Sequence, residues 1–473
     1  MIDLRNLTIK KAHEDMKAGK YSALDLTRAY IEEVKKKNPS INAYLEIFAD
    51  AEEQAKQADE RFKKGTATLL TGIPLAIKDN ILIEGKIASS ASKILKDYTA
   101  SYNATVINKL KEAGAVFLGR ANMDEFAMGG STENSAFGVT KNPFDTERVA
   151  GGSSGGSAAA LAMDGALAAL GSDTGGSIRQ PASFCGLVGL KPTYGRVSRY
   201  GVMAMGSSLD QIGPFGKTVE DAEIIYNIIK GKDERDGTTI SDHTYKVKDK
   251  KGKPVIGVPR AFLGGDGINK EVLKNFNDSL EKLKSLGYEI KDIELPNIGY
   301  SLAVYYVIMP AEVSSNMSRF DGVRYGLHKD GKDGIDDYFE TRGEGLGKEV
   351  RRRILLGTYV LSSGYYDAYY NRANTVRKII QSDFEKAFEK VDIIVTPTTP
   401  APAFKIGEKI SDPVAMYLED IFTVTANLTG MPAISIPSGF TESEKKLPLG
   451  IQMTATYGDE NVLFEVGKEF FGV

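Results

Sequence analysis

The sequence predicts an α/β protein whose large, mostly parallel mixed central sheet is covered by helices on both faces. Short apolar runs bounded by turn residues alternate with stretches of helical spacing, which is typical of strands joined by crossover helices. The chain has 473 residues, 42% hydrophobic and 26% charged, as in an ordinary soluble protein with a sizeable core. We expect one domain over residues 1–473, because strand-like runs occur on both sides of the polar stretch 232–252.

Residues 1–65 are predicted to form a helical N-terminal arm. Ser22 is a suitable N-cap for a helix whose apolar positions follow helical spacing, and the pair Asn38-Pro39 is expected to end it. A second helix is expected over residues 49–64, where Gly65 follows as a stop signal.

Residues 66–231 are expected to form the core that carries the functional motifs. The run GIPLAIKDNILI at 72–83 is apolar between turn residues and predicts a buried strand. Residues 104–113 are predicted to be a helix and residues 115–118 the next strand. The alanine-rich run 158–170 predicts a buried helix.

Residues 232–252 are polar without an apolar period and are interpreted as a surface excursion. Residues 253–473 are expected to complete the sheet. The pattern there predicts an amphipathic helix over 269–286 and strands within 253–259, 391–403, 433–440 and 449–455.

Composition argues against several classes of protein. The net charge of −3 shows no global basic signature for nucleic acid. Cys185 is the single cysteine and lies in an apolar run, which predicts a buried, inert thiol and excludes an intrachain disulfide. The N-terminus is polar, and no run approaches the roughly 20 apolar residues that a membrane span needs. We therefore predict a cytoplasmic protein without a membrane partner.

Two glycine-flanked serines, Ser153 and Ser177, are the candidate nucleophiles. A serine hydroxyl can attack a carbonyl group if a base takes its proton. The chain has three histidines, none within 50 residues of either serine, and it lacks a G-x-S-x-G elbow. A histidine base is therefore disfavoured.

Lys78 is the alternative base, because it ends the apolar run of the predicted strand at 72–83. Burial disfavours the ammonium form and lowers the pKa of a lysine, and ligands gather at strand ends in α/β sheets. The competing interpretation is a solvated surface lysine. Before Ser177, the backbone amides of Thr174, Gly175 and Gly176 could stabilise an oxyanion, although glycine-rich loops also occur as linkers or phosphate loops.

The run 151–182 is similar along its whole length to the motif of the amidase signature family, and the upstream IKDN motif joins it. The resemblance implies the amidase-signature fold and a Ser-Ser-Lys triad. Ser177 would be the acyl nucleophile, Ser153 the bridging proton relay and Lys78 the base. It also implies a cis peptide bond between Gly152 and Ser153.

Other segments resemble one group within that family, the glutaminase subunits of glutamyl-tRNA(Gln) amidotransferases. In that group glutamine is hydrolysed and its ammonia passes to a partner, the B protein, which converts Glu-tRNA(Gln) to Gln-tRNA(Gln) with ATP. The resemblance implies a heterotrimer completed by a small third partner, the C protein. The segments that carry it are 120–138, 190–202, 314–326, 351–370 and 419–437.

The same resemblance implies the substrate contacts. Arg353 would bind the α-carboxylate of glutamine and Asp420 its α-ammonium group, and arginine suits a carboxylate because it can donate two parallel hydrogen bonds. Tyr305 is expected to add a contact, with the adjacent Tyr306 as the alternative. Arg353 lies in an RRR run, where a solvated arginine on a helix is the competing interpretation.

No cofactor is expected on this chain. The glycines of GPFGKT at 213–218 are too close for a phosphate loop, and no His/Cys cluster suggests a metal. ATP and Mg²⁺ are expected on the B protein. Two rival functions remain: a stand-alone amidase for small amides, and a non-catalytic scaffold with the same fold.

Overall fold

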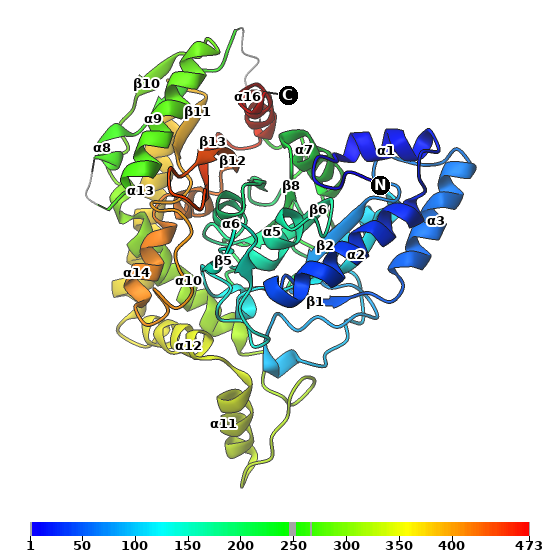
Figure 1. Cartoon of the computed structure of the whole chain (residues 1–473). Coiled ribbons are helices and arrows are strands. Elements are labelled where there is room, and N and C mark those ends of the chain that lie inside the picture. The colour runs from blue at the N-terminus through cyan, green and yellow to red at the C-terminus, as the bar shows by residue number, and fades with distance from the viewer. Residues whose placement is uncertain (1, 246–251, 265–266, 473) are drawn as a thin grey trace.

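The computed structural model describes residues 2–245, 252–264 and 267–472 (Figure 1). Within these residues, eleven strands form one sheet, and two more form a small separate pair. In spatial order the large sheet contains β1 (Tyr44–Ile47), β3 (Val116–Ala121), β2 (Pro74–Lys78), β6 (Ala168–Asp173), β8 (Gln211–Gly216), β7 (Val188–Lys191), β12 (Ala433–Phe440), β13 (Pro448–Ala455), β11 (Ile393–Pro397), β9 (Ile256–Val258) and β10 (Ile290–Asp292). The small pair is β4 (Lys141–Asn142) and β5 (Asp145–Val149).

The helices are distributed along the whole described chain. They are α1 (Ile9–Lys17), α2 (Ala23–Ile41), α3 (Ala51–Lys63), α4 (Thr105–Glu112), α5 (Gly155–Ala162), α6 (Arg179–Phe184), α7 (Val219–Ile229), α8 (Arg260–Leu263), α9 (Lys270–Ser285), α10 (Ser301–Met317), α11 (Gly334–Gly345), α12 (Lys348–Leu361), α13 (Arg372–Ala387), α14 (Pro413–Tyr417), α15 (Val424–Thr429) and α16 (Glu460–Phe471). Short 3₁₀ or π turns are η1 (Lys93–Leu95), η2 (Glu125–Ala127), η3 (Ile298–Tyr300), η4 (Asp367–Asn371) and η5 (Leu418–Asp420).

The predicted α/β architecture with one large mixed sheet is confirmed, but parallel pairing does not dominate it. Six pairings between neighbouring strands of the described sheet are antiparallel and four are parallel. The antiparallel pairings lie mainly in the middle of the sheet. There β12 and β13 are joined by a connection too short for a crossover, so they must run in opposite directions.

The middle of the sheet is covered on both faces. Every residue of β2, β6, β7, β8, β11 and β13 is buried, although alternate side chains of a strand point to opposite faces. Helices α5 and α6 contact β6, β12 and β13, while α7 and α16 contact β7, β8, β12 and β13. Strands from both sides of residues 232–252 belong to this sheet.

The N-terminal helices follow the sequence prediction with one difference. The Ser22 hydroxyl accepts from the amide of Asp25 in a capping box at the start of α2. Helix α2 does not end at Asn38-Pro39 as predicted but runs through Pro39 to Ile41, because a proline near the last turn removes few helical hydrogen bonds. Asn42, in the left-handed region with φ 59°, ends it.

The alanine-rich run 158–170 is only partly a helix, so that prediction was wrong in its second half. Helix α5 ends at Ala162, and the chain turns at Asp164, with φ 59°, before β6 begins at Ala168. Small apolar residues fit a buried helix and a buried strand equally well, and a short run has no periodicity to separate them.

The remaining elements agree with the sequence pattern. Helices α3, α4 and α9 and strands β2, β3, β9, β11, β12 and β13 all lie within or beside their predicted segments. Residues 232–245 form no helix or strand and are mostly exposed, while residues 246–251 of the predicted excursion lie outside the described residues. Cys185 is buried, and burial raises the pKa of its thiol. In the described part of the chain, no helix has the length and apolarity to cross a bilayer.

Candidate functional site

Lys78 is the last residue of β2, a strand buried along its whole length, and its side chain is fully enclosed. Its Nζ donates to the hydroxyls of Ser153 and Ser154, both at 2.8 Å. Burial lowers the pKa of Lys78 to about 7, although nearby aspartates act in the opposite direction. A substantial fraction of the amine is therefore neutral near pH 7 and able to accept a proton.

The Lys78 ammonium has further partners that the sequence did not reveal. Ser172 accepts from it twice, through Oγ at 2.9 Å and through the backbone carbonyl at 3.3 Å. Asn80 donates to the same Ser172 hydroxyl at 3.0 Å. In the sequence, Asn80 and Ser172 were marked only by their closeness to the motifs around Lys78 and Ser177. The contact between Ser172 and Lys78 could not be read there, because it arises from the pairing of β6 with β2.

Ser153 lies two residues before α5, after a cis peptide bond from Gly152, at the position that the family resemblance implied. Its hydroxyl contacts Lys78 directly. The carbonyl of Ser177 accepts from the amide of Ser154 at 3.2 Å, so the two serine loops are adjacent. Among the described residues, no hydrogen bond uses the Ser177 hydroxyl, and Ser177 keeps 8% of its surface exposed. The structure thus brings the three residues together and leaves one hydroxyl free.

A buried ion pair holds the turn before Ser177. Asp173 accepts from Arg179 through both carboxylate oxygens, at 2.9 and 3.1 Å, and neither side chain is exposed. Arg179 also donates to Asn427 and Gln452, which ties the turn to distant segments. Burial would raise the pKa of Asp173, but Arg179 lowers it to about 2. The carboxylate therefore stays ionised and the turn stays anchored.

The three amides expected to form an oxyanion site are not equivalent. The Gly176 amide already donates to Asp173 at 2.9 Å, so the expectation of three free donors does not hold for Gly176. Within the described chain, no hydrogen bond engages the amides of Thr174 and Gly175. A Cβ on Gly175 would lie 2.6 Å from the Tyr305 phenol, so this close approach requires glycine.

Tyr305, Tyr306 and Asp420 meet beside this loop. Tyr305 and Tyr306 lie on α10, and their rings are perpendicular with centroids 4.9 Å apart. The Tyr306 hydroxyl donates to Asp420 at 2.8 Å, whereas Tyr305 faces Gly175. Burial raises the pKa of Asp420 to about 7, against the opposing effect of Tyr306 and Arg353. Each tyrosine that the sequence left as an alternative therefore contacts another candidate site residue, Tyr306 through Asp420 and Tyr305 beside Gly175.

Arg353 lies on α12 and is only 4% exposed, unlike a solvated helix arginine. Its Nε donates to Glu349 at 2.8 Å, and its guanidinium lies 5.8 and 5.6 Å from the ring centroids of Tyr306 and Tyr417. Burial lowers the pKa of Arg353, but Glu349 and the tyrosines outweigh it and raise the pKa overall. The site therefore contains a permanent cation, with Glu349 and Tyr417 as neighbours that were not predicted from the sequence.

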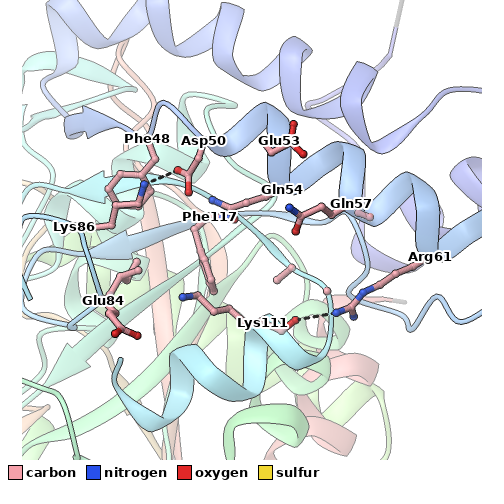
Figure 2. Close-up of a pocket in the computed structure, with 14 residues that line it drawn as sticks. Phe48, Asp50, Glu53, Gln54, Gln57, Arg61, Glu84, Lys86, Lys111 and Phe117 are labelled. Atoms are coloured by element: carbon pink, nitrogen blue, oxygen red, sulfur yellow. Dashed lines mark hydrogen bonds and ion pairs between the residues drawn. The ribbon is translucent and has the colours of Figure 1, made fainter. Parts of the chain in front are cut away.

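A separate groove of about 380 Å³ lies between α3 and the loop after β2 (Figure 2). It is lined by side chains of both charges, and Lys86 pairs there with Asp50 at 2.6 Å. None of the predicted site residues lines this groove, so it is distinct from the site around Lys78.

Comparison with known proteins gives one consistent result. The amidase family model matches residues 25–464. The A subunit of glutamyl-tRNA(Gln) amidotransferase from Thermoanaerobacter pseudethanolicus is 54% identical, with 99% of this chain and 96% of that protein covered. The protein of the same name from Desulfatibacillum aliphaticivorans is 49% identical, with 99% and 97% covered. The crystal structure of its Thermotoga maritima counterpart is 43% identical with a TM-score of 0.79, covering 99% of this chain and 95% of that one.

Proposed function

Because this chain belongs to the amidase family, we propose that it hydrolyses glutamine as the glutaminase component of a glutamyl-tRNA(Gln) amidotransferase. The names of relatives that are about half identical over nearly the whole chain support this choice within the family. One observation in the structure carries the substrate assignment: the buried cation Arg353 and the carboxylate Asp420 meet around Tyr306. These opposite charges complement the free α-carboxylate and α-ammonium groups of glutamine.

In the proposed reaction Ser177 Oγ attacks the side-chain carboxamide carbon, its proton passes to Ser153, and the proton of Ser153 passes to Lys78. The resulting oxyanion accepts from the free amides of Thr174 and Gly175. Collapse breaks the C–N bond while the proton returns through Ser153 to the leaving nitrogen, so ammonia departs. Water then attacks the γ-glutamyl ester, its proton passes through Ser153 to Lys78, and the same path returns a proton to Ser177 Oγ as glutamate leaves.

The proposed partners follow from the fate of ammonia. The B protein would activate Glu-tRNA(Gln) with ATP and Mg²⁺ and receive the ammonia, and the C protein would complete a cytoplasmic heterotrimer. This chain would itself bind glutamine and no cofactor or metal.

The stand-alone amidase is the function that must be distinguished from this proposal. We expect glutamate release from glutamine to rise at least about tenfold when the B and C proteins, Glu-tRNA(Gln) and ATP are added, because partner contacts complete the site in coupled enzymes. Release is measured with and without each addition, using propionamide as a control substrate. An unchanged rate with glutamine, together with rapid propionamide hydrolysis, would favour the stand-alone amidase.

An exposed apolar face on α12 and the following turn supports a protein partner beside the site. Monomeric proteins rarely expose a large cluster of leucines and tyrosines, and tyrosine is enriched at interfaces. Figure 1 shows α11 projecting from the body near α12. Helix α12 also carries Arg353, so a partner on this face would lie close to the site. The exposed members are Leu355, Leu356, Tyr359, Tyr365, Tyr366 and Tyr369.

Replacing Leu355, which is 71% exposed, by aspartate should weaken binding of the B protein by roughly tenfold or more, because a charge replaces buried interface area. Binding is measured by titration of the purified proteins. Phe440→Asp, on an exposed residue of β12, serves as the matched control and should leave binding unchanged. Equal affinity for wild type and Leu355→Asp would exclude this face as the contact.

A further inference from the structure

Glu125 is a buried carboxylate that the proposed reaction does not use. One of its oxygens accepts from the backbone amide of Gly347 at 2.8 Å, and the other accepts from the Ser92 hydroxyl. Gly347 is the N-cap of α12 and has no side chain to cap the helix. Glu125 therefore accepts from the N-cap amide, which the N3 side chain pairs in a capping box and which Val350, the N3 residue of α12, cannot pair.

The same loop reaches the proposed proton relay at its other end. The amide of Asp124 donates to the carbonyl of Ser153 at 3.1 Å. The Asp124 carboxylate accepts from the amides of Ser131, Thr132 and Asn134, so this end is held firmly. Two consecutive residues thus connect Ser153 with the start of the helix that carries Arg353.

A second connection runs from Lys78 to the same point. Asp79, the next residue, accepts from the amides of Ser89 and Ala91 at 3.2 and 2.8 Å. Ser92 follows, and its hydroxyl contacts Glu125 and the carbonyl of Gly345 at 3.2 Å. Glu125 is the point at which both connections meet the turn before α12.

The backbone of these two loops is unusual. Ser90, Ala91, Phe126 and Ala127 have positive φ values of 51°, 50°, 48° and 62° without being glycine. Such conformations persist only where the surroundings determine them, and they concentrate at functional sites. The loops around Glu125 therefore have a defined backbone conformation, which fixes the position of the Glu125 carboxylate.

We propose that Glu125 is a positioning residue that sets the distance between Arg353 and the Ser153–Lys78 pair. This inference rests on the proposed function, in which glutamine spans these two points. Its α-carboxylate would bind Arg353 while its carboxamide reaches Ser177, so a shift of α12 would misplace one end of the substrate. Small amides that lack an α-carboxylate would not report that shift.

Removal of the acceptor should raise KM for glutamine. We expect Glu125→Ala to raise it by about tenfold or more with kcat changed less than about threefold, since the buried hydrogen bond to the Gly347 amide is lost. Hydrolysis of propionamide should change less than about threefold. Glu125→Gln keeps an acceptor for the Gly347 amide and should restore KM to within about threefold of wild type.

Gly347→Ala provides a second variant that leaves Glu125 in the chain. A Cβ at this position would clash with a Glu125 carboxylate oxygen, so it should separate the two groups and raise KM similarly. Asp221→Ala, which removes a buried carboxylate from the capping box of α7, is the control for loss of stability alone.

The inference is overturned if Glu125→Ala and Gly347→Ala lower the melting temperature as Asp221→Ala does but leave KM for glutamine at the wild-type value. It is also overturned if glutamine and propionamide turnover fall by the same factor. The wild-type rate with glutamine in the same assay tests the proposed function. The role of Glu125 is tested separately, by the ratio of each variant's KM to that of the wild type.

Discussion

Ser177→Ala should reduce glutamine hydrolysis by a factor of at least about 10³, because the proposed acyl-enzyme forms on the Ser177 hydroxyl and residual catalysis comes from binding alone. The Ser177 hydroxyl has no hydrogen bond among the described residues, so its removal should leave the fold intact. Glutamate release by the assembled complex at saturating glutamine measures the loss.

Ser183→Ala is the matched control for this experiment. Ser183 lies in α6, the next helix along the chain, and its buried hydroxyl also has no hydrogen-bond partner in the described structure. This variant should retain most of the activity, and both variants should still assemble with the partner proteins. Normal turnover by Ser177→Ala would exclude Ser177 as the nucleophile.

Lys78→Met should be nearly as severe, because a thioether of similar length cannot accept the proton that Ser153 passes on. Members of a relay act as a unit, so the loss should again be at least about 10³. Lys191→Met tests whether any buried lysine is needed. Burial also lowers the pKa of Lys191 to about 7, but its Nζ donates to the Pro192 carbonyl outside the proposed triad. An inactive Lys191→Met together with an active Lys78→Met would reverse the assignment.

The pH profile gives an independent measure of the same base. Only neutral Lys78 accepts a proton, and its pKa is about 7, so kcat should fall about tenfold per pH unit below that value. The pKa of Asp420 is also raised to about 7, so kcat/KM should contain a second acidic group. The pH dependence of kcat should not contain this group, because the α-ammonium group of bound glutamine keeps Asp420 ionised. A kcat that is constant between pH 5 and 8 would contradict a lysine base.

Much of the candidate site was accessible from the sequence because its residues occupy local patterns. Ser153 and Ser177 stand in one glycine-rich run, and Lys78 ends an apolar strand pattern. Their proximity follows from strand order, because β2 and β6 are parallel neighbours and place Lys78 beside Ser172. Most elements with clear caps or periodicity were also predicted correctly.

The parts that could not be predicted depend on contacts between distant segments. The division of 158–170 into α5 and β6 has no periodic signal, and antiparallel pairing in the middle of the sheet depends on strand order. The commitment of the Gly176 amide to Asp173 appears only in the folded turn. Glu349 is four residues before Arg353, so this pair could have been predicted from helical spacing. Glu125, by contrast, reaches that helix from a segment 222 residues away along the chain.

The sequence by itself determined the α/β class, the candidate reacting residues and the family, because short motifs and local periodicity carry that information. The tertiary structure decided how far the pKa of Lys78 is lowered, which amides are free and how Arg353 is held. The physical reason is that desolvation, hydrogen-bond competition and helix placement depend on the groups that surround a residue in space. In this protein those groups come from strands and helices far apart along the chain.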